Sequence, residues 1–116
     1  MRTRLTVLLL LALAALTANT AIAADNVHSG EIMDSQCAMM GSHDSMMKGM
    51  GAKNAKECTQ QCVQMGGKYV LYDAAQKTTY QLDDQKKSAA FAGQKVKVTG
   101  DLKGKTIHVQ KIEPAT

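Results

Sequence analysis

The sequence predicts a mainly β domain, a small five-stranded barrel with one helix, that follows a cleavable leader. Short runs of β-branched and aromatic residues with alternating polarity recur along the second half of the chain, and turn residues separate them. The 116 residues, less a leader, suffice for one domain with a thin core. A chain of this size and pattern is typical of a small barrel.

The first 23 residues are expected to be a secretory signal peptide. Arg2 and Arg4 form a basic start, residues 5–16 are almost wholly apolar, and Ala21-Ile22-Ala23 has the small-x-small pattern of a cleavage site. The apolar run of 12 residues is shorter than the roughly 20 that span a bilayer, so no stable membrane anchor is expected after cleavage. We therefore expect a single periplasmic or secreted domain, residues 24–116.

The first elements of this domain are a strand at residues 27–33, a Met-rich loop at 34–53 and a helix at about 55–65. The loop contains several Gly and Ser residues and shows no helical or strand periodicity. Asn54, with a Glu three residues later, resembles a capping box, and a Gly-Gly pair follows the helix. The sequence thus predicts an irregular segment that connects a strand to a helix.

The remaining chain predicts two hairpins. Residues 68–73 and 78–83 form the first, a short helix follows at 86–92, and 94–102 with 105–112 form the second. This layout is close to an OB-type barrel; a flat α+β sheet of the same strands is the alternative, but barrel closure removes the exposed edges. The expected core comprises Ile32, Val63, Tyr69, Leu71, Tyr80, Leu82, Phe91, Val96, Val98, Leu102, Ile107, Val109 and Ile112.

The charge balance excludes a nucleic-acid binder. Beyond the leader the chain has 12 Lys, no Arg and 10 acidic residues, and it has no Trp. Nucleic-acid affinity depends on clustered cations and stacking aromatic side chains. No nucleophile, base and orienting group can be placed together either, so the sequence does not predict an enzyme.

Two cysteines, Cys58 and Cys62, lie four residues apart in the predicted helix. This spacing puts their side chains on one face, about 5–6 Å apart at Cβ. A disulfide between them would distort the helix, because both Cβ vectors lean the same way along its axis. Each thiol therefore needs a partner elsewhere, and Cys37 is the third cysteine of the chain.

The second feature is a run of methionines near His43. Five Met occur in residues 39–50, a density that a core without periodicity does not explain. Thioether, imidazole and thiolate together are a soft ligand set, suited to copper(I) or, with thiolates dominant, to zinc. The expected metal ligands are Cys37, Cys58, Cys62, His43, Met46, Met47 and Met50.

The same cysteines and methionines are compatible with other functions. Cys37 could form a disulfide with Cys58 or Cys62, giving a disulfide-stabilised structural module, or one whose barrel face binds an unknown ligand. The Met run could then be an adaptable partner-binding surface. A thiol oxidoreductase is the third possibility and the weakest, because the redox Cys-x-x-Cys spacing at a helix N-terminus is absent.

Four segments carry a family resemblance: Asp-Ser-x-Cys at 34–37, Cys-Thr-x-x-Cys-Val at 58–63, Gly-Lys-Tyr-Val-Leu at 67–71, and residues 92–100. The chain resembles a group of small secreted bacterial domains of unknown function. This resemblance implies an OB-like barrel, export, and three cysteines that belong together. The Cys-x-x-x-Cys spacing is also similar to that of copper chaperones of respiratory oxidase assembly, which have other folds.

Overall fold

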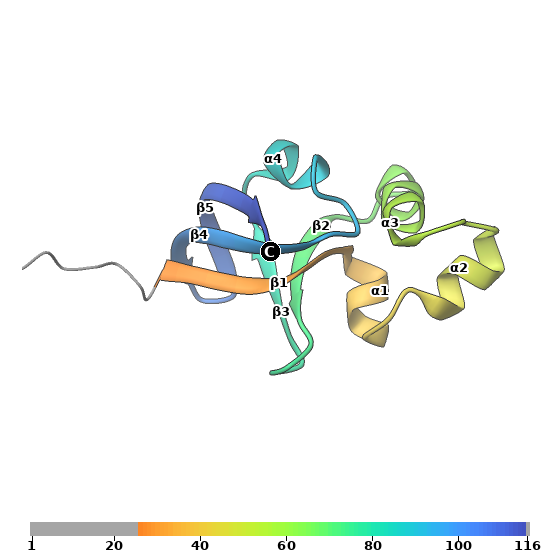
Figure 1. Ribbon diagram of the computed structural model, residues 1–116, viewed down its shortest axis with the longest axis horizontal. Coiled ribbons are helices and arrows are strands. Elements are labelled where there is room, and N and C mark those ends of the chain that lie inside the picture. Colours follow the sequence, from red (N-terminus) through yellow and green to blue (C-terminus); the bar gives the residue numbers. More distant parts are fainter. Residues whose placement is uncertain (1–25, 116) are drawn as a thin grey trace, which may run out of the picture.

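The computed structural model describes residues 26–115, and the predicted signal peptide, residues 1–23, lies outside this range (Figure 1). Its strands are β1 (Val27–Asp34), β2 (Tyr69–Asp73), β3 (Thr78–Leu82), β4 (Lys95–Lys103) and β5 (Thr106–Pro114). Its helices are α1 (Ser35–Met40), α2 (Asp44–Met50), α3 (Ala55–Gln64) and α4 (Gln85–Ala89). Within residues 26–115, no helix combines the length and apolar character that crossing a bilayer requires.

The five strands form a closed barrel in the order β1-β2-β3-β5-β4. The number of strands and the closure of the barrel agree with the prediction from the sequence. Every neighbouring pair is antiparallel except β3 and β5, which are parallel. Closure leaves no long unpaired strand edge, which would otherwise be available for aggregation.

The barrel interior is a compact apolar core. Ile32, Leu71, Leu82, Val96, Val98 and Ile107 are buried there, and Tyr69, Tyr80, Phe91, Val109 and Ile112 pack around them. Burying one such aliphatic side chain contributes about 1.5–3 kcal/mol. Two expected core residues differ: Val63 is only half-buried, and Leu102 is 43% exposed because it lies near the free end of the β4–β5 hairpin.

The prediction of an irregular loop at residues 34–53 is wrong, so the fold has more helix than the one main helix expected. The segment folds as α1 and α2, whereas α4 corresponds to the short helix expected at 86–92. The Asp34 carboxylate accepts the N–H groups of Gln36 and Cys37 and so starts α1. Gly41 and Gly51, at φ of 73° and 68°, end α1 and α2. These two glycines therefore terminate two short helices and do not mark an irregular loop.

Helix α3 occupies the region where the sequence predicts a helix at about 55–65. Asn54 Oδ1 accepts the N–H of Glu57 at 2.9 Å, in agreement with the capping interpretation. The chain before β4 packs on the start of α3: Gly93, at φ of 73°, leaves no room for a Cβ against the backbone of Ala55 and Lys56. Figure 1 shows α1, α2 and α3 grouped on one side of the barrel and α4 separate from them.

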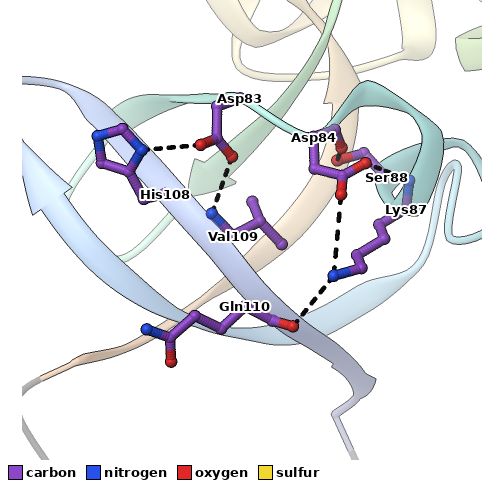
Figure 2. Close-up of polar contacts among 7 residues, drawn as sticks. All are labelled: Asp83, Asp84, Lys87, Ser88, His108, Val109 and Gln110. Carbon is purple, nitrogen blue, oxygen red and sulfur yellow. Dashed lines mark hydrogen bonds and ion pairs between the residues drawn. The ribbon is translucent and has the colours of Figure 1, made fainter.

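The β3–β5 seam is the shortest contact of the barrel, with two residue pairs in register. Asp83, just after β3, extends it: its carboxylate accepts the Val109 N–H and pairs with His108 Nδ1, each at 2.8 Å (Figure 2). The hydrogen bond from Val109, with His108 adding to it, lowers the pKa of Asp83. Asp84 then caps α4 by accepting the Lys87 N–H at 2.9 Å.

Candidate metal centre

A second core lies outside the barrel, between β1, β2 and the three grouped helices. Strand alternation sends Ile32 and Leu71 into the barrel and Met33 and Val70 toward the helices. The buried members of this second cluster are Met33, Cys37, Ala38, Ala52, Cys58, Cys62 and Val70. Sulfur side chains make up four of these seven positions. We refer to this group as the sulfur cluster.

The three cysteines lie together in the sulfur cluster. Cys37 projects from α1, while Cys58 and Cys62 come from successive turns of α3. Their exposed fractions are 0%, 0% and 2%, and all three thiols are free. The structure therefore brings the three predicted sulfur ligands together without the disulfide of the alternative interpretation.

His43 completes this group from the loop between α1 and α2. It occupies the N-cap position of α2, but its side chain makes no capping hydrogen bond. Instead the ring is buried, 8% exposed, with Nε2 at 3.1 Å from Glu31 Oε1. Nδ1 is buried with no hydrogen-bond partner in residues 26–115. An unpaired buried polar atom costs about 1–3 kcal/mol, so a ligand at Nδ1 would remove a penalty.

The ligand atoms converge to within the reach of one ion. A ring nitrogen of His43 and the Sγ atoms of Cys37 and Cys58 all lie within 4.8 Å of one another. Two sulfur ligands of a tetrahedral ion with bonds of about 2.3 Å are separated by about 3.8 Å, so small side-chain shifts would close the shell. A second set, Asp34, Cys37 and Cys62, also lies within 4.8 Å and shares Cys37 with the first.

The methionines divide into two groups. Met46, Met47 and Met50 of α2 are half-buried against the sulfur cluster, and Met50 Sδ lies 3.7 Å from Cys62 Sγ. Met39 and Met40 of α1 are 83% and 50% exposed. Helical spacing within α2, absent from the sequence interpretation, directs the first group inward. Met46 and Met47, both predicted ligands, therefore contact the sulfur cluster. Met50, the third predicted ligand in α2, also has a sulfur–sulfur contact with Cys62.

Burial makes the thiols poor acids in the protein without an ion. It raises the pKa of Cys62 to about 11, and the nearby Asp34 carboxylate adds to the effect. It also raises the pKa of Cys37 far above its usual range, with the Asp34 hydrogen bond and charge as the next causes. A cation at the site would reverse this balance, because it stabilises thiolate directly.

The ligand set expected from the sequence does not include two groups at this site, Glu31 and Asp34. Glu31 is two positions before Met33 on β1, so it lies on the strand face that looks toward the helices. Nothing local in the sequence links it to His43, 12 residues away. Asp34 has a local signal, since an Asp directly before a helix is a common N-cap, but the helix itself was not predicted.

Residues 63–115 match the model of a family described as "Protein of unknown function (DUF5818)". The match covers less than half of the 116-residue chain and begins directly after Cys62. It includes β2 to β5 and α4, and it leaves out β1, the sulfur cluster helices α1 and α2, and the four residues Cys37, His43, Cys58 and Cys62. No curated protein and no solved structure matches the chain.

Proposed function

We propose that this protein binds one soft metal ion, copper(I), in the buried centre formed by Cys37, Cys58 and His43. The observation that carries the proposal is the convergence of free, buried thiols on a buried imidazole whose Nδ1 has no partner in residues 26–115. Thiolate and imidazole are the ligands that soft and borderline metal ions prefer. Cys62, beside Cys37, is in place to serve as a further ligand.

Copper(I) is favoured over zinc by the thioethers. Met50 Sδ contacts Cys62 Sγ at 3.7 Å, and Met46 and Met47 pack on the same cluster. Thioether sulfur is a ligand for copper(I), whereas structural zinc sites use thiolate, imidazole and carboxylate. A zinc ion held by three cysteines and His43 is the second candidate, and the same donor set supports it.

The proposal includes the fold type and the location. The strand order β1-β2-β3-β5-β4, with a helix between β3 and β4, supports an OB-type barrel. The basic, apolar and small-x-small pattern of residues 1–23 supports export to the periplasm or beyond. An exported copper(I) site of this kind would serve metal handling rather than catalysis.

A disulfide-stabilised module is the competing function, because Cys37 Sγ lies within 4.8 Å of both other thiols. Oxidation in the periplasm or outside the cell could join Cys37 to Cys58 or to Cys62. A thiol oxidoreductase has less support: burial raises the pKa of Cys37 and Cys62, and a reactive thiol needs the opposite shift.

Thiol counting and metal analysis on one sample test the proposal. Protein purified from the periplasm under anaerobic conditions should begin at Ala24, release three reactive thiols in denaturant, and bind one equivalent of copper(I) in competition with a chromogenic chelator. Cys58→Ser should abolish stoichiometric binding, because it removes one of the two thiols grouped with His43. The matched control, Met39→Leu, changes an 83% exposed sulfur residue and should bind like the wild type.

A different thiol count and the absence of metal uptake would support the competing function. One free thiol with no copper(I) or zinc uptake would overturn the metal centre and support the disulfide module. In that case Cys58→Ser or Cys62→Ser would lower the unfolding temperature through loss of the cross-link, which typically contributes about 2–4 kcal/mol.

A further inference from the structure

Glu31 stands at the junction between the barrel and the metal centre. It lies on β1, where its backbone is fixed on both sides, opposite Tyr72 of β2 and Lys95 of β4. Its carboxylate reaches His43 Nε2 at 3.1 Å, and its side chain is 26% exposed. A strand between two hydrogen-bonded neighbours is the most rigid support that this fold offers for such a contact.

His43, by contrast, comes from a connection between two short helices. Its backbone carbonyl accepts the N–H of Met47 and starts α2, but its ring has no role in capping. In residues 26–115, the side-chain partner of the ring is Glu31. The orientation of the imidazole is therefore determined by the barrel strand more than by the helix that follows it.

The pairing also determines which nitrogen is free. A carboxylate accepts a hydrogen bond, so Nε2 carries the proton, and Nδ1 of the neutral ring then holds the lone pair. Nδ1 is the buried nitrogen without a partner, and a ring nitrogen of His43 is grouped with the thiols of Cys37 and Cys58. Carboxylates that hold the second nitrogen of a ligating histidine orient the ring and raise its basicity.

We propose that Glu31 is the positioning residue of the metal centre, holding the Nε2–H of His43 so that Nδ1 is the ligating atom. The inference rests on the proposed metal binding and goes beyond it, because it assigns the ligating nitrogen and a residue that does not touch the ion. A cavity of about 250 Å³ lined by Glu31, Ser42, Tyr72 and Lys95 borders this pair, so the carboxylate is solvated on one side while the ring remains buried.

The test uses the exported protein with copper(I) alone, and with zinc(II) alone, as probes. Glu31→Ala should weaken binding by about 10- to 100-fold, the usual effect of losing such a partner. Glu31→Gln, whose side-chain oxygen still accepts the Nε2–H, should recover most of the affinity. The matched control is Glu113→Gln, which removes a strand carboxylate paired with Lys111 on the surface, and it should bind like the wild type.

A double variant separates positioning from general stability. If Glu31 acts through the ring, Glu31→Ala combined with His43→Ala should bind no more weakly than His43→Ala alone. Nitrogen-15 NMR of the loaded wild type should show a metal-bound Nδ1 and a protonated Nε2, and Glu31→Ala should lose this signature. The melting temperature of the metal-free variants, followed by circular dichroism, identifies any variant that fails to fold, for which Glu31→Gln is the substitute.

The outcomes are distinguishable. Ligation through Nε2, or equal affinity and equal imidazole signals in the wild type and Glu31→Ala, overturns the role of Glu31 and leaves the metal centre intact. A wild-type protein that binds neither ion overturns the metal centre and the role of Glu31 with it. Loss of affinity in Glu31→Ala, recovery in Glu31→Gln and no further loss in the double variant establish the assignment.

Discussion

The thiols of Cys37, Cys58 and Cys62 differ from ordinary buried cysteines in what lies beside them. A buried cysteine usually behaves as a small hydrophobic residue, and Met33, Ala38 and Val70 provide such surroundings here. The imidazole of His43 does not fit a purely apolar core, because its Nδ1 is buried and has no partner in residues 26–115. This polar atom among thiols is what favours the proposed metal centre over a sulfur-rich core.

Met50 provides a residue-scale test of which ion binds. Met50→Leu keeps the volume and the apolar contacts of the side chain but removes the thioether beside Cys62. If Met50 ligates, the copper(I) affinity should fall at least tenfold while the zinc(II) affinity stays unchanged, because zinc sites do not use thioether. Parallel chelator competitions with the two ions measure this difference.

The control for that experiment is Met65→Leu, a 66% exposed methionine at the end of α3. It should change neither affinity. Equal copper(I) affinities for Met50→Leu and the wild type would mean that Met50 packs against Cys62 without binding the ion.

At the scale of elements, α2 is the least supported helix around the sulfur cluster. It has no fully buried residue and no side-chain N-cap, and it contains Gly49. Three half-buried methionines attach it to the cluster. An element with so few buried contacts opens more readily than the barrel strands, so we expect reagents to reach the thiols when α2 opens.

Gly49→Ala should make α2 open less often. Alanine is favoured over glycine in a helix by about 1 kcal/mol, and nothing lies within 4 Å of the added Cβ. Thiols of the metal-free protein should then react about fivefold more slowly with a disulfide reagent under native conditions, since 1.4 kcal/mol corresponds to a factor of ten. The rate of thiol labelling, measured by absorbance, checks this expectation.

Gly51→Ala is the paired variant with the opposite sign. Gly51 ends α2 at φ of 68°, where a side chain introduces strain of about 1–2 kcal/mol. Labelling should therefore accelerate in Gly51→Ala. Identical rates in the wild type and both variants would show that the thiols are reached by another route.

The same segment shows where prediction from sequence reached its limit. Helix α3 has ten residues and an Asn54 cap, so its local signals are strong. Helices α1 and α2 have six and seven residues, too short for periodicity to be recognised, and their terminal glycines resemble loop residues. Tertiary contacts through the buried Cys37 and the half-buried methionines stabilise what local propensity alone does not.

For the whole molecule, two cores share β1 and β2. One face of these strands packs into the barrel and the other contacts the sulfur cluster. An ion bound only to the folded state therefore stabilises the entire domain, by about 2.7 kcal/mol at a free concentration of 100 times Kd. The barrel in turn depends on its shortest seam, between β3 and β5.

Asp83 makes this seam dependent on pH. Its pKa is lowered from the ordinary value of 3.8 in the folded protein, first by the Val109 N–H and then by His108. A lowered folded-state pKa adds stability that is present above the unfolded value and is lost as pH falls through the folded one. The stability advantage of the wild type over Asp83→Asn should therefore be largest above about pH 5 and shrink toward pH 3.

Urea unfolding at pH 6, 4 and 3 measures the difference between the two proteins. Asp101→Asn is the control, because Asp101 is exposed and accepts a side-chain N–H from Asn26 rather than a backbone N–H across the seam. A gap between the wild type and Asp83→Asn that stays constant or widens as pH falls would contradict the role assigned to Asp83.

The residue order suffices to predict the strands, the barrel-forming alternation, the α3 cap and a group of candidate metal ligands. These are local or periodic signals, which a single chain carries in its residue order. The packing of the folded chain, in contrast, brings the thiols of α1 and α3 to His43, leaves Met39 and Met40 exposed, and places the Glu31 carboxylate on the imidazole ring. Such juxtapositions depend on how β1, β2 and three helices pack, because the residues concerned come from separate elements and no local spacing encodes their distances.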